Sequence, residues 1–180
     1  MAYLLLGQEE YHEHHSEVTQ CRFSSSGYTI ASSDVDGVVK VWSASPGPPQ
    51  TYATFVSQAG VSALDWFPNS DRKFVYGTMT GNVRICDKDD RKAAAEFNVD
   101  ENQAHFIKQI CCSSTGNLCA IASEAPGDQG ILMVYDLKSG KTVETNLTMN
   151  LSSGFGQSTV TSCVFNHNAQ MIITGKCMEI

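Results

Sequence analysis

The apolar residues of this chain occur in short runs rich in β-branched and aromatic side chains, and Gly, Ser, Asn, Asp or Pro bounds each run. Runs of this kind are typical of β-strands that end in tight turns. A spacing that would place the apolar residues along one side of a helix is nearly absent. The pattern therefore predicts an all-β fold.

The strand pattern repeats along the chain. Four segments start with an apolar residue, reach another bulky or apolar residue five positions later and then enter a turn. They are VTQCRFSSSG from Val18, VSALDWFPNS from Val61, IKQICCSSTG from Ile107 and VTSCVFNHNA from Val160. Their starts are separated by roughly 40–55 residues, which is near the repeat length of a propeller blade.

Each of these segments is the first strand of a longer unit. Second strands are predicted to begin at Thr29, Lys73, Asn117 and Met171, third strands at Gly37, Gly81 and Gly130, and weaker fourth strands near 51–56, 94–99 and 142–147. Four short antiparallel strands repeated in this way form a blade of a β-propeller. We expect one domain over residues 1–180, with about three and a half blades and one preceding strand at 3–6.

The last unit stops early. After the ITG at 173–175 a blade would continue into a turn and a third strand, but the chain ends at Ile180. Closed propellers usually have about four to eight blades. The sequence therefore predicts an incomplete propeller and a truncated product, whose uncovered blade faces favour association or poor solubility.

Charge and composition narrow the range of partners. The chain has 12 Lys and Arg against 19 Asp and Glu, which gives a formal net charge of −7. Because phosphate-backbone binders carry a basic stripe, nucleic acid is not an expected partner, and direct docking on an anionic lipid surface is not expected either. No apolar run approaches the roughly 20 residues of a membrane-spanning helix, and the YLLL at 3–6 is too short for a signal peptide.

The cysteines indicate a reducing, cytosolic compartment. There are seven of them, they form no C-x-x-C pair, and most lie inside apolar runs. This predicts buried free thiols rather than a disulfide framework or a zinc finger. Cys111 and Cys112 are adjacent, but neighbours on a strand point to opposite faces, so a redox pair between them is not expected.

The segment HSEVTQCRFSSSGYTIASSDVDGVVKVW, which ends at Trp42, resembles a WD repeat. A looser resemblance to the WD-repeat family covers nearly the whole chain. The Trp-Asp pair of the family reads Trp42-Ser43, Cys86-Asp87 and Tyr135-Asp136, so no unit keeps both residues. The resemblance implies a WD-repeat β-propeller.

The resemblance also implies which residues tie the first blade together. A turn histidine, a hydroxyl on the second strand, a turn aspartate and the tryptophan bind one another in such repeats, and His14, Ser32 (with Ser33 as the alternative), Asp36 and Trp42 stand at those positions. The later units have Thr80 and Gln129 at the aspartate position, and Ser57, Gln103 and Gly156 at the histidine position. The first blade is thus expected to be the best ordered, and Trp42→Ala to cost about 3–5 kcal/mol.

The stretch YHEHHSE, from Tyr11 to Glu17, holds three histidines in seven residues. A metal site is not expected there, because the spacing is not that of two helical ligands and the candidate cysteines lie on strands. Loops from fourth to first strands and from second to third strands share one face of a propeller. Partner-binding residues expected on that face are Tyr11, His12, His15, Gln58, Asp128 and Phe155.

The resemblance is closest to an endosomal member of the family, through GQEEYHEHHSEV, DVDGVVKVWS and FNHNAQMIITG. It implies a non-catalytic scaffold on the cytosolic face of early and late endosomes. The implied role is that of a late-endosomal Rab effector that regulates phosphatidylinositol 3-phosphate and early-to-late endosome conversion. The implied partners are a Rab GTPase, a phosphatidylinositol 3-kinase complex or another WD-repeat protein, with only indirect membrane contact.

Two other classes of function fit the sequence less well. Substrate receptors of cullin-type ubiquitin ligases often carry Arg two places after the Trp-Asp pair, but Ser45, Asp89 and Lys138 stand there, and a generic WD-repeat adaptor is the broader alternative. An enzyme is not expected, because no nucleophile–base pair is evident and the SGKT at 139–142 lacks the first glycine of a phosphate loop, where Tyr135 stands. No cofactor is expected.

Overall fold

The computed structural model describes residues 10–45, 47, 50–125, 130–144 and 158–178. Within these ranges every regular element is a β-strand. No helix in this described part is long and apolar enough to cross a membrane. The expected preceding strand at 3–6 lies outside the described ranges.

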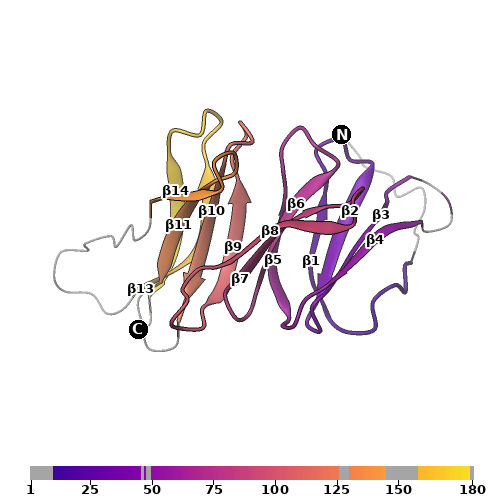
Figure 1. Ribbon diagram of the computed structural model, residues 1–180, viewed down its shortest axis with the longest axis horizontal. Coiled ribbons are helices and arrows are strands. Elements are labelled where there is room, and N and C mark those ends of the chain that lie inside the picture. The colour runs from indigo at the N-terminus through magenta and orange to yellow at the C-terminus, as the bar shows by residue number, and fades with distance from the viewer. Residues whose placement is uncertain (1–9, 46, 48–49, 126–129, 145–157, 179–180) are drawn as a thin grey trace, which may run out of the picture.

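The strands form three four-stranded sheets and one two-stranded sheet, all antiparallel and in chain order (Figure 1). The first sheet contains β1 (Val18–Phe23), β2 (Thr29–Asp34), β3 (Val38–Ser43) and β4 (Thr51–Val56). The second contains β5 (Val61–Trp66), β6 (Lys73–Thr78), β7 (Asn82–Asp87) and β8 (Lys92–Asn98), and the third contains β9 (Phe106–Cys112), β10 (Leu118–Glu124), β11 (Ile131–Asp136) and β12 (Lys141–Glu144). The fourth contains β13 (Ser158–Phe165) and β14 (Ile172–Met178). The prediction of an all-β chain built from blades is confirmed.

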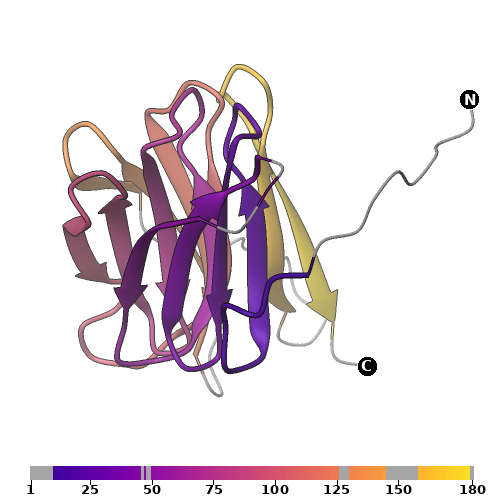
Figure 2. The same cartoon turned by 90° about the vertical axis from the view of Figure 1, so that its right-hand side faces the viewer.

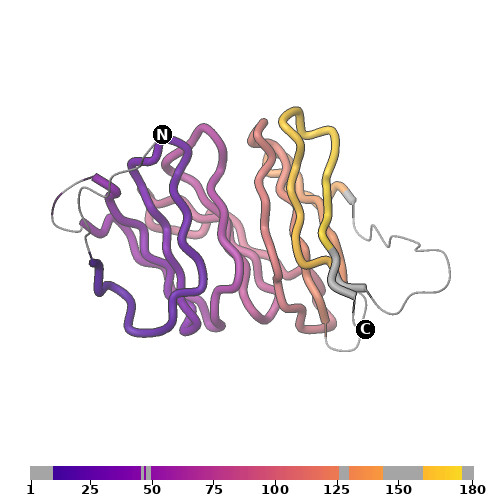
Figure 3. Tube along the Cα trace, turned by 180° about the vertical axis from the view of Figure 1, so that it is seen from behind, coloured from indigo at the N-terminus to yellow at the C-terminus, as the bar shows by residue number. Residues whose placement is uncertain are grey.

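The four sheets follow one another across the molecule, from the indigo N-terminal sheet to the yellow C-terminal sheet (Figures 1 and 3). The first strands of successive sheets lie against each other, β1 on β5, β5 on β9 and β9 on β13. Viewed from its end, the molecule shows the strands of each sheet side by side (Figure 2). The architecture is that of neighbouring blades in a propeller.

The core consists of apolar layers between successive sheets. Phe74 and Tyr76 of β6 are fully buried against Phe55 of the first sheet and Trp66 of β5. A second layer with Ile107, Ile121 and Val83 joins the second and third sheets, and a smaller one joins the third and fourth. Burial of each large side chain contributes about 2–3 kcal/mol, so neighbouring blades depend on each other for their stability.

Polar side chains of the first strands tie each blade to the next. Gln20 donates its amide to the carbonyl of Ser62 at 3.2 Å, the Asp65 carboxylate accepts the N–H of Cys112 at 2.7 Å, and Gln109 accepts the N–H of Cys163 at 3.2 Å. Burial raises the pKa of Asp65 in spite of the bonds from the Cys112 and Trp66 N–H groups. The same kind of link thus recurs at all three described blade interfaces.

The tight turns explain two of the repeating sequence positions. Gly37 and Gly81 have φ angles of 86° and 92°, which favour glycine, and each N–H closes a turn on the carbonyl of the last residue of the preceding strand. At the end of each third strand, the side chain of Ser43, Asp87 or Asp136 accepts N–H groups of the turn that follows. The position after the family's tryptophan is therefore a turn-capping position.

Candidate protein-interaction face

A chain of hydrogen bonds closes one end of the first blade. The indole N–H of Trp42 donates to Ser32 Oγ at 3.1 Å, and Ser32 Oγ lies 2.7 Å from Nε2 of His14. The other ring nitrogen of His14, Nδ1, lies 2.7 Å from Oδ2 of Asp34. Because a carboxylate accepts only, Nδ1 of His14 donates to Asp34, and every member of the chain of hydrogen bonds has a partner.

The aspartate of this chain is Asp34, and the expectation of Asp36 is wrong. Asp34 is the last residue of β2, where its Oδ1 also accepts the N–H groups of Asp36 and Val38 at 3.1 and 2.9 Å. This turn geometry leaves Oδ2 directed at His14. Asp36 lies exposed within the turn and accepts a hydrogen bond from the hydroxyl of Ser16. Asp36 is adjacent to Gly37 in sequence, but the turn begins two residues earlier, at Asp34.

The environment of Asp34 favours its ionised form. Burial alone would raise its pKa, but the hydrogen bonds from His14 and from the N–H of Val38 outweigh burial and hold the pKa below its usual value. The side chains of His14 and Asp34 are only 7% and 3% exposed. The carboxylate therefore serves as a fixed internal acceptor.

The hydrogen bonds connect a serine, a histidine and an aspartate in the same sequence of contacts as a hydrolase triad: Ser32 to His14 to Asp34. The amino-acid sequence did not reveal this arrangement. In such a triad the serine oxygen must be open to a substrate. Ser32 is 4% exposed, lies in the fully buried strand β2, and already accepts the indole N–H of Trp42. The arrangement stabilises the blade and offers no accessible nucleophile.

The expected contact residues around this blade end differ in their surroundings. Tyr11 packs against the indole of Trp42, with ring centroids 4.5 Å apart, so it covers the hydrogen-bond chain. The side chain of His12 is 88% exposed and lies 3.7 Å from Glu10, and His15 is exposed. Between them, Glu13 pairs with Lys40 at 3.2 Å, which lowers the pKa of Glu13. His12 and His15 are therefore exposed at this end of the blade.

Gln58 lies on the same face, on the other side of the β2–β3 turn. The N–H of Val35 in this turn bonds to the carbonyl of Glu17, and Gly37 lies close to the carbonyls of Ser57 and Ala59. Residues 57–60 and the histidine segment thus flank one turn. Asp128 and Phe155, also expected on this face, lie outside the described residues.

Beside Gln58 is a polar groove of about 250 Å³ between the first and second blades. Its lining residues are Ser57, Gln58, Ala59, Thr78, Thr80, Asn82, Arg84, Glu96 and Asn98. Arg84 donates to the carbonyl of Val56 at 2.9 Å, which joins the blades, and its Nε lies 3.0 Å from Glu96. Gln58 was expected on this face from the sequence, whereas Arg84 and Glu96 were not, because their meeting depends on the β7–β8 pairing.

The later blades have only parts of the hydrogen-bond chain. In the second, Thr78 rather than Thr80 takes the place of Asp34 and accepts the N–H of Asn82 at 3.1 Å. In the third, Gln103 is exposed, and the buried histidine is His105, which lies 3.5 Å from Ser123 and 3.6 Å from Asp100. In the sequence, this histidine could have been recognised by its position two residues before Ile107, the apolar start of the third unit. Gln129 and Gly156 lie outside the described residues.

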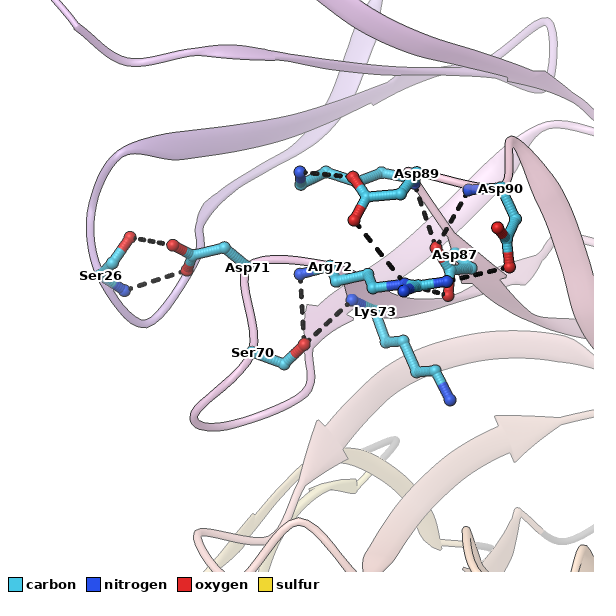
Figure 4. Close-up of polar contacts among 9 residues, drawn as sticks. Ser26, Ser70, Asp71, Arg72, Lys73, Asp87, Asp89 and Asp90 are labelled. Carbon is cyan, nitrogen blue, oxygen red and sulfur yellow. Dashed lines mark hydrogen bonds and ion pairs between the residues drawn. The ribbon is translucent and has the colours of Figure 1, made fainter.

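The loops at the opposite strand ends carry a second set of charges (Figure 4). Arg72 lies 2.6 Å from the buried carboxylate of Asp87 and 2.9 Å from Asp90, beside a hollow of about 420 Å³ that Lys73 also lines. Nearby, Asp71 accepts hydrogen bonds from the N–H and hydroxyl of Ser26 in the first blade. Most of these charged side chains are paired with each other, and the bonds of Asp71 to Ser26 link the two blades. In the described ranges no group of three His, Cys, Asp or Glu is arranged to hold a metal ion.

Known proteins are similar to this chain in both its repeat and its fold. The family described as "WD domain, G-beta repeat" matches residues 8–43. WD repeat-containing protein 91 from Danio rerio is 35% identical over 185 residues, which cover 96% of this chain and 25% of that protein. The protein of the same name from Gallus gallus is 32% identical, with the same coverage, and the homolog from Dictyostelium discoideum is 29% identical over 99% of this chain and 22% of its own length.

The chain therefore spans about a quarter of the length of these curated relatives. Among solved structures, the C-terminal WD40 domain of Sif2 superimposes with a TM-score of 0.68, covering 91% of this chain and 44% of that one at 20% identity, and this likeness concerns the fold alone. The repeat matched over 8–43, the blade-like sheets and the propeller neighbour agree: the chain carries a WD repeat at residues 8–43, and its described sheets form part of a WD-repeat β-propeller.

Proposed function

We propose that this chain is part of a non-catalytic protein-interaction scaffold that acts at endosomes. The similarity to WD repeat-containing protein 91, which extends over 96% of this chain, carries the proposal. This chain spans only about a quarter of the length of those proteins, so any role of the longer proteins is proposed for it.

The geometry of the described blades supports the proposed role as a protein-interaction scaffold. Propellers hold loops on rigid sheets, and exposed polar side chains on such loops are typical of binding surfaces. His12, His15 and Gln58 are exposed around one turn, next to the groove between the first two blades. The serine–histidine–aspartate arrangement is buried and fully bonded, so it supports the fold rather than a reaction.

The finer role follows the endosomal resemblance of the sequence. In this proposal the chain is an effector of a late-endosomal Rab GTPase and regulates phosphatidylinositol 3-phosphate during early-to-late endosome conversion. A phosphatidylinositol 3-kinase complex or another WD-repeat protein is the further partner, on the cytosolic face of early and late endosomes. The net charge of −7 favours membrane contact through these partners rather than directly.

Binding of the full chain to purified Rab GTPases, each loaded with a GTP analogue or with GDP, tests the proposal. We expect binding to a late-endosomal Rab in the GTP state, weakened at least tenfold by Gln58→Arg on the proposed face. Gln50→Arg is the matched control, because Gln50 is exposed in the β3–β4 loop at the opposite strand end. Recovery of a cullin adaptor from lysate without any GTP-dependent Rab binding would overturn the proposal in favour of a ligase receptor.

A further inference from the structure

Two cysteines of the third blade face each other across the β9–β10 hairpin. Cys112 on β9 and Cys119 on β10 are direct cross-strand partners. Both pack in the apolar layer between the second and third sheets, so their side chains leave the same face of the sheet. The adjacent Cys111 packs in the other layer, with Cys163. The partner of Cys112 is therefore Cys119, seven residues away in sequence.

The backbone bonds show which kind of pair this is. The N–H of Ser113 donates to the carbonyl of Leu118 at 2.9 Å, so those two residues are a hydrogen-bonded pair. Pairs alternate along an antiparallel ladder, which makes Cys112 and Cys119 a non-hydrogen-bonded pair. In agreement, the N–H of Cys112 points away from β10 and donates to Asp65 at 2.7 Å.

This type of pair brings the two side chains close. Cα atoms in non-hydrogen-bonded pairs are about 4.5 Å apart, and disulfides span Cα separations of about 4.4–6.8 Å. Two thiols at this position therefore meet the distance requirement of a disulfide without any change in strand register.

The equivalent pairs in the other described sheets contain large apolar residues. They are Phe23 with Ile30, Trp66 with Phe74, and Phe165 with Ile172. The third blade is the one described sheet with two thiols at this place. In the third blade two small cysteines therefore stand where the other sheets have two large apolar side chains. This places two reactive thiols opposite each other in the hairpin.

We propose that Cys112 and Cys119 are a disulfide-forming site that a hydroperoxide oxidises. The sulfur of one thiolate attacks a peroxide oxygen and breaks the O–O bond, which gives a sulfenic acid and, after protonation, one water or alcohol. The second sulfur then attacks the sulfenic sulfur, the S–S bond forms, and the hydroxyl leaves as water. Two thiols lose two electrons and two protons, and the peroxide is reduced.

Burial makes the pair slow to react in the closed blade. Cys119 is 1% exposed, and a hydrogen bond with the Cys119 thiol, together with burial, raises the pKa of Cys112. Since the thiolate is the nucleophile, oxidation follows local opening of the hairpin. Once formed, the bond joins β9 to β10 and opposes further opening of β9, which packs on β5 and β6 of the second blade.

The test is oxidation of the full chain with hydrogen peroxide under native conditions, followed by thiol titration in denaturant and mass spectrometry without reduction. Chymotrypsin, which cleaves after Leu118, separates the two cysteines into linked peptides. We expect the wild type to lose two thiols and to give a Cys112–Cys119 link. Cys112→Ser and Cys119→Ser should each lose this link, whereas Cys86→Ser should keep it, because buried Cys86 faces Phe74 and Ala93 and no thiol.

A dominant Cys111–Cys163 link, intermolecular disulfides or sulfinic acids in place of the Cys112–Cys119 link would overturn the proposal, as would no loss of thiols before the chain unfolds. Should the serine variants fail to fold, the wild type decides alone. The specific link must dominate after oxidation in native buffer and be replaced by mixed pairings after oxidation in urea.

Discussion

Removal of the Asp34 carboxylate tests whether Asp34, as the structure shows, or Asp36, as expected from the sequence, holds His14. Asp34→Ala leaves three donors without their acceptor: Nδ1 of His14, held at 2.7 Å, and the N–H groups of Val38 and Asp36, at 2.9 and 3.1 Å. Hydrogen bonds to a charged group contribute about 1.5–3 kcal/mol each. Water reaches the turn N–H groups in part, so we expect a total loss of about 3–4 kcal/mol.

Asp36→Ala is the matched control. The Asp36 side chain is exposed and bonds to Ser16, so its removal should change stability by no more than about 0.5 kcal/mol. Urea unfolding at neutral pH, followed by tryptophan fluorescence, measures both variants. In a chain of this size the Asp34 variant should also melt roughly 6–15 °C lower. Equal losses in the two variants, or an Asp34→Ala loss below about 0.5 kcal/mol, would refute the assignment of Asp34 to the chain.

Further predictions concern the same turn and the opposite face. The pKa of Asp34 is lowered in the folded state, so its contribution is present above the unfolded value of about 3.9 and is lost as pH falls through the folded value. Asp34→Asn should therefore reduce stability at pH 7 yet flatten the stability loss in acid, as pH-dependent urea titrations would show. Gly37→Ala should cost about 3 kcal/mol, because its Cβ would lie 2.6 Å from the carbonyl of Ala59, whereas Gly27→Ala, with open space around it, should cost about 1 kcal/mol by thermal unfolding. Asp87→Ala should cost about 2 kcal/mol and Arg72→Ala less than about 1 kcal/mol, because Asp87 is 5% exposed and caps a turn while Arg72 is 49% exposed; the reverse order in urea unfolding would contradict this reading.

The local pattern of this sequence was enough to predict its strands and their repeat. Alternation of apolar residues and the turn residues around Gly37 and Gly81 act over a few positions, so strands such as β4 and β5 begin where the pattern placed them. His14, Ser32 and Trp42 were predicted from the resemblance of one segment to a WD repeat, because a single repeat supplies all three.

Tertiary structure decided the pairings between elements that the pattern left open. Which aspartate reaches His14 depends on where the β2–β3 turn begins, a shift of two residues that leaves the apolar pattern unchanged. Arg84 meets the carbonyl of Val56 only because the second blade packs on the first. Cys112 meets Cys119 only through the register of β9 with β10, which the hairpin hydrogen bonds fix. The sequence by itself determined what each segment forms, and packing between segments determined which side chains meet, because those contacts join residues that no short-range pattern connects.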